Sequence, residues 1–132
     1  MTSPCYCANL RMAARKISAR YDEGLAPSGI NVAQYGLLRR IARTEGISLT
    51  ELGALSGLDR STIGRNVRVL ERMKLVKSGR GKDQREAVVR LTETGSATLA
   101  AATPLWQACQ KEVEDRFGPD NLKLLQEALE AL

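Results

Sequence analysis

The sequence predicts a mainly α-helical chain with a minor β component, and three observations point to this fold class. The 132 residues are 43% hydrophobic but only 4% aromatic, so we expect a core of aliphatic side chains. Apolar residues recur at three- and four-residue steps and long β-branched runs are absent, which favours helices. Two short apolar segments flank a polar loop within residues 75–91, and this pattern predicts one β-hairpin.

Two amphipathic helices are predicted in the first third of the chain. The first spans about residues 5–25 and ends at the Ala26-Pro27-Ser28-Gly29 stretch, because proline and glycine interrupt helices. The second runs from Asn31, its expected N-cap, to about Thr44.

Two further helices joined by a glycine-containing turn are predicted next. Ser48 and Glu51 have the spacing of a capping box, which satisfies two free backbone N–H groups at a helix start. That helix ends at Gly57, and Asp59 caps a longer one that runs from Arg60 to about Met73. Two helices joined in this way form a helix-turn-helix. The buried face of the second is expected to carry Ile63, Val67 and Leu70.

A hairpin with a basic tip is predicted directly after the helix-turn-helix. Residues 75–78 and 86–91 form its two strands, and the polar loop 79–85 joins them. A hairpin in this place is a wing, so the predicted architecture is a winged helix-turn-helix core with a two-stranded wing. A solvated hairpin without a binding role is the alternative interpretation.

Terminal helices complete the predicted fold. Thr92 caps a long helix that ends near Phe117, and Pro119 starts a last one, since proline is favoured in a first helical turn. These helices carry more apolar surface than a small winged core can cover, and a second copy of the chain would bury it. We therefore predict a homodimer with dimerisation helices at residues 1–30 and 92–132 and a DNA-binding core at 31–91. The alternative is that the terminal helices pack only on their own core.

Basic charge is concentrated between Arg60 and Arg90. This segment has ten basic and three acidic residues, a net charge of +7, whereas residues 1–59 carry +2 and residues 91–132 carry −4. A local charge of this density is typical of a phosphate-binding surface, although a solvated helix face can be basic as well.

Several classes of protein are made improbable by what the sequence lacks. Histidine is absent, and Cys5, Cys7 and Cys109 do not have the spacing of a zinc site, so we expect no enzyme, no metal and no cofactor. No apolar run reaches the roughly 18 residues of a membrane span, and no signal-peptide core is present. We expect a cytoplasmic protein that does not bind a membrane.

Five short runs and one glycine carry a family resemblance: Asp59-Arg60-Ser61-Thr62-Ile63, Leu70-Glu71-Arg72, Leu75-Val76, Asp83-Gln84-Arg85, Val89-Arg90-Leu91-Thr92 and Gly95. Together they resemble the MarR family of winged-helix regulators. The resemblance implies an obligate homodimer that places two recognition helices in successive major grooves of a pseudo-palindromic DNA operator. It also implies repression that is relieved by a small phenolic or aromatic ligand or by an oxidant.

Specific roles follow for the residues of the predicted DNA surface. Arg65 and Asn66 are expected to read base edges, because arginine and asparagine make paired hydrogen bonds to guanine and adenine. Ser61, Thr62 and Arg68 are expected to position the helix on phosphates. By resemblance, Arg85 enters the minor groove and Asp83 holds the wing tip through an ion pair. Arg60, Arg80 and Lys82 complete the predicted DNA-binding set.

The residues that would control release from DNA are less clearly indicated by the sequence than the DNA surface is. Cys7 and Tyr21 coincide with a reactive cysteine and a tyrosine of the hydroperoxide-sensing branch of the family, in which the tyrosine hydrogen-bonds the thiolate of the other subunit. A second tyrosine of that branch falls on Val32 here. The alternative is that Cys7 is a small buried apolar residue without a redox role. A ligand pocket is expected between the winged core and the dimerisation helices.

Two other functions are compatible with a winged helix. It can serve as a protein–protein interaction module without DNA binding, which would not need ten basic residues on one helix and wing. It can also be the dimerisation domain of an enzyme, but the chain has no glycine-rich cofactor loop and no room for a catalytic domain.

Overall fold

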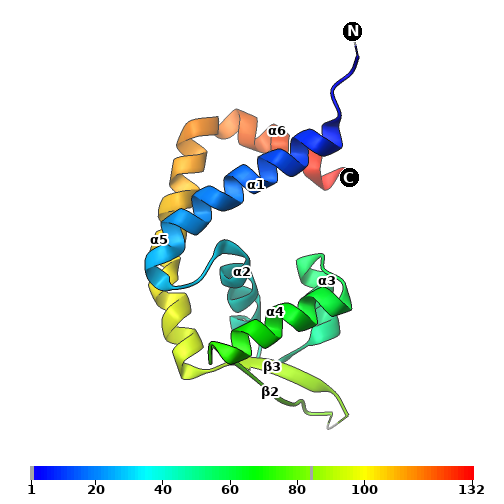
Figure 1. Cartoon of the computed structure of the whole chain (residues 1–132), viewed down its shortest axis with the longest axis vertical. Helices are drawn as coiled ribbons and strands as arrows, with labels where there is room; N and C mark the ends of the chain where they lie inside the picture. Colours follow the sequence, from blue (N-terminus) through cyan, green and yellow to red (C-terminus); the bar gives the residue numbers. More distant parts are fainter. Residues whose placement is uncertain (1, 84) are drawn as a thin grey trace.

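Figure 1 shows a computed structural model of the chain in which the long helix α5 joins two groups of elements. The structure describes residues 2–83 and 85–132, so Gln84 of the predicted wing motif lies outside the described residues. Helices α1 and α6 lie at one end of α5 with both termini, and the helix-turn-helix and wing lie at the other end. The elements are α1 (Tyr6–Leu25), a short 3-10 helix (Ala26–Ser28), α2 (Val32–Ala42), β1 (Ile47–Ser48), α3 (Leu49–Ser56), α4 (Arg60–Arg72), β2 (Val76–Arg80), β3 (Ala87–Leu91), α5 (Glu93–Phe117) and α6 (Pro119–Glu130).

The core of the molecule lies among α2, α4, α5 and the sheet. Ile63, Val67 and Leu70 of α4 are all buried, which confirms the apolar face predicted for this helix. They pack in one cluster with aliphatic residues of α2 and the strands. Tyr35 stacks on Trp106 with ring centroids 5.5 Å apart, so α2 is also held against α5 by an aromatic pair.

The sheet has three strands rather than the two that the sequence predicts. Strand β1 pairs antiparallel with β3, in the order β1-β3-β2, with Ile47 opposite Val89. A strand of two residues is too short to produce an alternating pattern. The mainly helical fold class with a winged helix-turn-helix is otherwise confirmed.

Predicted helix caps are observed at the starts of several helices. The side chains of Asn31, Asp59 and Thr92 accept hydrogen bonds from the backbone N–H three residues on. The Ser48 hydroxyl likewise accepts the Glu51 N–H at 3.1 Å. The reciprocal Glu51 bond is not formed in the described part of the chain, and Ser48 is already paired in the sheet with Val88.

The first turn of α5 approaches the chain just before β2 very closely. A Cβ atom built on Gly95 would lie 1.9 Å from the carbonyl oxygen of Leu75. The Thr92 N–H donates to that same oxygen at 3.0 Å, and the Thr92 hydroxyl donates to the Lys74 carbonyl at 2.6 Å. Only glycine allows this contact, which fixes α5 on the winged core.

Among the described residues, no helix is both long enough and apolar enough to cross a membrane.

Candidate nucleic-acid interface

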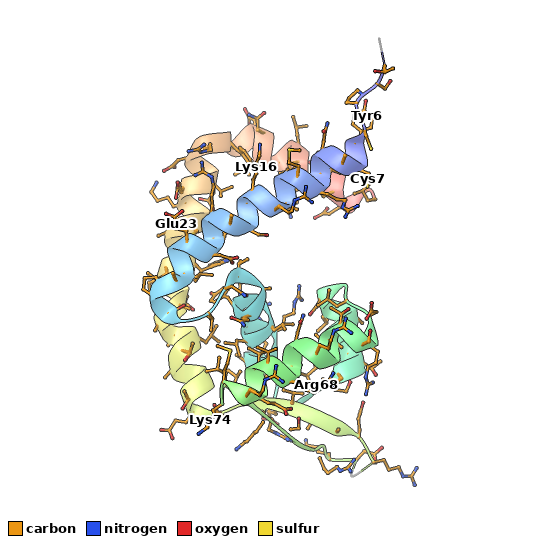
Figure 2. The ribbon with its side chains drawn as sticks, in the orientation of Figure 1. Tyr6, Cys7, Lys16, Glu23, Arg68 and Lys74 are labelled. Carbon is orange, nitrogen blue, oxygen red and sulfur yellow. The ribbon has the colours of Figure 1, made fainter. Side chains whose placement is uncertain are left out.

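Helix α4 presents a stripe of polar and basic side chains on the face opposite the core. Because an α-helix has 3.6 residues per turn, Ser61, Arg65, Arg68 and Arg72 fall along one line, and all of them are exposed. Figure 2 shows Arg68 on this helix. Arg72 was not among the predicted DNA-binding residues. It could have been found from its position four residues after Arg68, because residues four apart lie on the same face of a helix.

The N-terminus of α4 is fixed by its capping aspartate. The Asp59 carboxylate accepts the Thr62 backbone N–H at 2.8 Å and the Ser61 hydroxyl at 2.9 Å. The Thr62 N–H bond, followed by the Ser61 bond, holds the pKa of Asp59 below its usual value. The hydroxyl of Ser61 is therefore directed by the cap while the residue stays exposed.

Thr62 and Asn66 lie at the margin of the exposed face of α4. Both are half-buried, whereas Arg65 is exposed. Asn66 lines a hollow between α2, α3 and α4 together with Arg40 and Ser56. It is thus placed nearer to α2 than Arg65 is, and its role in reading bases stays a prediction.

The wing tip is organised by backbone hydrogen bonds around Asp83. The Gly81 N–H donates to the Glu86 carbonyl, and the Glu86 N–H to the Asp83 carbonyl, each at 3.1 Å. The Asp83 side chain accepts the Arg85 N–H at 3.1 Å. Among the described residues it makes no ion pair, unlike the arrangement that the resemblance implied. The nearby backbone donor supports the tip, and the Arg85 guanidinium forms no ion pair with any residue that the structure describes.

The basic residues between Arg60 and Arg90 make no salt bridge in the part of the chain that the structure describes. Arg80, Lys82 and Arg85 are all exposed. Arg60 donates to the Thr50 hydroxyl at 2.8 Å and so links the start of α4 to α3. A basic surface whose charges form no ion pair within the described residues is available to phosphates.

The two predicted redox residues lie far apart within one chain. Cys7 is exposed near the start of α1, and Figure 2 shows it at the opposite end of that helix from Glu23. Tyr21 is fourteen residues further along, about 21 Å on a helix that rises 1.5 Å per residue. The Tyr21 hydroxyl donates to the Gln110 side chain. Burial, followed by Cys109 and then Glu114, raises the pKa of Tyr21.

Exposed apolar side chains gather on the terminal helices. Helix α6 has no buried residue at all, and α1 buries only Tyr21 and Leu25. Most of the large hydrophobic residues that are exposed belong to these helices or to the chain beside them: Tyr6, Leu10, Met12, Phe117, Leu124, Leu125, Leu129 and Leu132.

Together, the helix-turn-helix, the wing and the unpaired basic side chains on both define a winged-helix DNA-binding protein. The sequence profile of the MarR family matches residues 28–86. No curated protein matches the chain in sequence.

Solved structures resemble the chain over nearly its whole length. The M. tuberculosis transcriptional regulator MosR, in complex with DNA, is 35% identical, with 97% of this chain and 98% of that one covered and a TM-score of 0.82. The repressor CouR, bound to a 23-mer DNA duplex, is 26% identical, with 93% and 88% covered and a TM-score of 0.82. A variant of E. coli MarR complexed with operator DNA is 24% identical, with 94% and 90% covered and a TM-score of 0.85, and supports the fold.

The chain therefore belongs to the MarR family of DNA-binding transcriptional regulators. Members of this family are regulators and not enzymes.

Proposed function

We propose that the protein is a homodimeric repressor that binds a pseudo-palindromic operator in double-stranded DNA. The observation that carries this proposal is the exposed, unpaired basic surface of α4 and the wing. Structures of MosR and CouR with DNA support it, since both relatives are similar over most of the chain. Two half-sites would be centred about 10 base pairs apart, one turn of the double helix.

Within each half-site, α4 occupies the major groove and the wing lies over the adjoining minor groove. Arg65 and Asn66 read base edges, and Arg85 enters the minor groove, where a narrow groove favours arginine. Asp83 supports the wing tip. The residues proposed to contact the DNA backbone are Arg60, Ser61, Thr62, Arg68, Arg80 and Lys82.

The dimer forms through the terminal segments, residues 1–30 and 92–132. The exposed apolar side chains of α1, α6 and the end of α5 support this assignment. At about 25 cal/mol per Å² of apolar surface buried, covering such a surface favours association. The core at residues 31–91 then carries the DNA contacts.

DNA release is proposed to follow from binding of a small phenolic or aromatic ligand or from oxidation of Cys7. Tyr21 would take part in the redox route only across the dimer, because it lies far from Cys7 in its own chain. Operator binding measured with aromatic acids and with peroxide, each with and without reductant, separates the two routes. Loss of the peroxide response in Cys7→Ser but not in Cys5→Ser supports oxidation, and an equal response in Cys7→Ser excludes it.

The test of the proposed function is selection of a binding site from random duplex DNA, followed by titration of variants. Arg65→Ala is expected to cost about 1–3 kcal/mol and to relax one base position in each half-site. Arg43→Ala removes the same charge at the end of α2, outside the basic segment, and serves as the matched control. An equal loss of affinity for all DNA sequences would indicate that Arg65 contacts phosphate and not bases. Absence of any DNA affinity would favour a protein-interaction module.

A further inference from the structure

Arg90 differs from the other basic residues of the segment between Arg60 and Arg90. It is half-buried on the central strand β3. Its Nε–H donates to the backbone carbonyl of Glu45 at 2.7 Å, across 45 positions of sequence. The guanidinium is therefore engaged within the protein, whereas the wing arginines Arg80 and Arg85 have exposed side chains.

Two glycines lie against the Arg90 guanidinium, and Gly46 makes the closer approach. A Cβ atom on Gly46 would lie 3.0 Å from Cζ of Arg90, and one on Gly79 would lie 3.4 Å from Nη1. Gly46 has a φ of 143°, a conformation that favours glycine. The planar group thus lies against backbone on both sides of β3, next to β1 and on β2.

These contacts join the two DNA-binding elements. Gly46 is followed at once by β1, and Ser48 is both the last residue of β1 and the N-cap of α3. Gly79 belongs to β2, which leads into the wing loop. Through Glu45, Gly46 and Gly79, Arg90 holds the start of the helix-turn-helix against the strand that carries the wing.

We propose that Arg90 is a positioning residue, which fixes the wing relative to the helix-turn-helix and does not bind phosphate. This inference rests on the proposed function, in which α4 and the wing contact DNA together. Simultaneous contact in two grooves requires a fixed relation between the elements, since displacements of about 1 Å already weaken positioned contacts.

The substitution Arg90→Lys separates positioning from charge. Lysine keeps the positive charge but lacks Nε–H and the planar group. Arg90→Lys and Arg90→Gln are both expected to lose operator affinity about tenfold. Lys77→Gln is the matched control, because Lys77 faces Arg90 in the register and is exposed. The proposal would be overturned in favour of a phosphate contact by two results together. Arg90→Lys would bind the operator with near-native affinity, and the slope of log affinity against log salt concentration would be smaller by about 0.9 in Arg90→Gln.

A double-mutant cycle with Arg85→Ala tests whether Arg90 acts through the wing. If it does, Arg90→Lys weakens binding less than about twofold once Arg85 has been removed. Full additivity would overturn the proposal.

Hydrogen exchange of the protein without DNA keeps this test independent of the proposed function. Arg90→Lys is expected to raise the exchange of backbone amides at residues 45–48, 79–83 and 85–87, while the amides of α1 and α5 stay protected. Unchanged exchange in those segments would overturn the positioning role. If the exchange pattern is as expected but the wild-type protein does not bind duplex DNA, the proposed function fails and the positioning role of Arg90 stands.

Discussion

Replacing Gly95 with alanine tests the contact that seats α5 on the winged core. The new Cβ would lie 1.9 Å from the Leu75 carbonyl oxygen, and real Cβ atoms essentially never come closer than 3.0 Å to a neighbour. The first turn of α5 must therefore move by at least about 1.1 Å. A shift of that size stretches the Thr92 N–H bond to Leu75 and the Thr92 hydroxyl bond to Lys74.

The expected loss of folding stability is large for the addition of one methyl group. Each weakened hydrogen bond contributes about 1 kcal/mol, and forcing extra volume into a packed contact costs about 1–3 kcal/mol. The higher helix propensity of alanine offsets at most about 1 kcal/mol of this loss. We expect Gly95→Ala to lower the free energy of unfolding by about 2–4 kcal/mol, which corresponds to a fall in Tm of roughly 10 °C for a chain of this size.

Urea denaturation followed by far-ultraviolet circular dichroism measures this loss at fixed protein concentration. Ser96→Ala is the matched control, since Ser96 is the next residue on α5 and is exposed, and its midpoint should change little. A Gly95→Ala midpoint equal to that of Ser96→Ala would refute the close approach of α5 to Leu75.

Three further substitutions test the interface and its supports. Gly64→Ala adds a Cβ that comes no closer than 3.8 Å to Arg68, so the free energy of unfolding should rise by about 1 kcal/mol. If the DNA backbone approaches Gly64, the same substitution should lower operator affinity. Unchanged affinity would contradict that approach. Lys74 has a φ of 64°, so Lys74→Gly should raise the urea midpoint by relieving about 1 kcal/mol of strain, and a lowered midpoint would contradict this. The pKa of Asp59 is lowered by folding, so its stabilisation is present above the unfolded pKa of about 3.9 and is lost as pH falls through the folded value. Asp59→Asn keeps a capping oxygen and should lose less stability than wild type on acidification below about pH 4, as followed by urea midpoints; an identical acid loss would contradict the linkage.

The sequence predicted the features that depend on neighbouring residues. Caps at Asn31, Asp59 and Thr92 are local hydrogen bonds over three residues, and the burial of Ile63 follows from helical spacing. These interactions are encoded within one turn of the chain, so a pattern of residue types is enough to find them.

Features that depend on tertiary contacts were not predictable. In the sequence, Arg90 looks like one more basic residue, whereas in the fold its side chain donates to the Glu45 carbonyl, 45 positions away. Tyr21 pairs with Gln110, 89 positions away. Strand β1 exists because Ile47 meets Val89 in the folded chain. Asp83 supports the wing through a backbone donor rather than through the arginine charge.

Helix α5 has a mechanical consequence for the proposed dimer. Its 25 residues extend for about 37 Å at 1.5 Å per residue, from the sheet to the apolar terminal helices (Figure 1). Although Pro104 lies within it, α5 is one continuous helix. A helix of this length acts as a lever, so a tilt of about 5° at the end proposed to dimerise displaces the other end by about 3 Å. In the proposed complex, two α4 helices must match half-sites one DNA turn apart at the same time. A small rotation between the two subunits would then put both helices out of register.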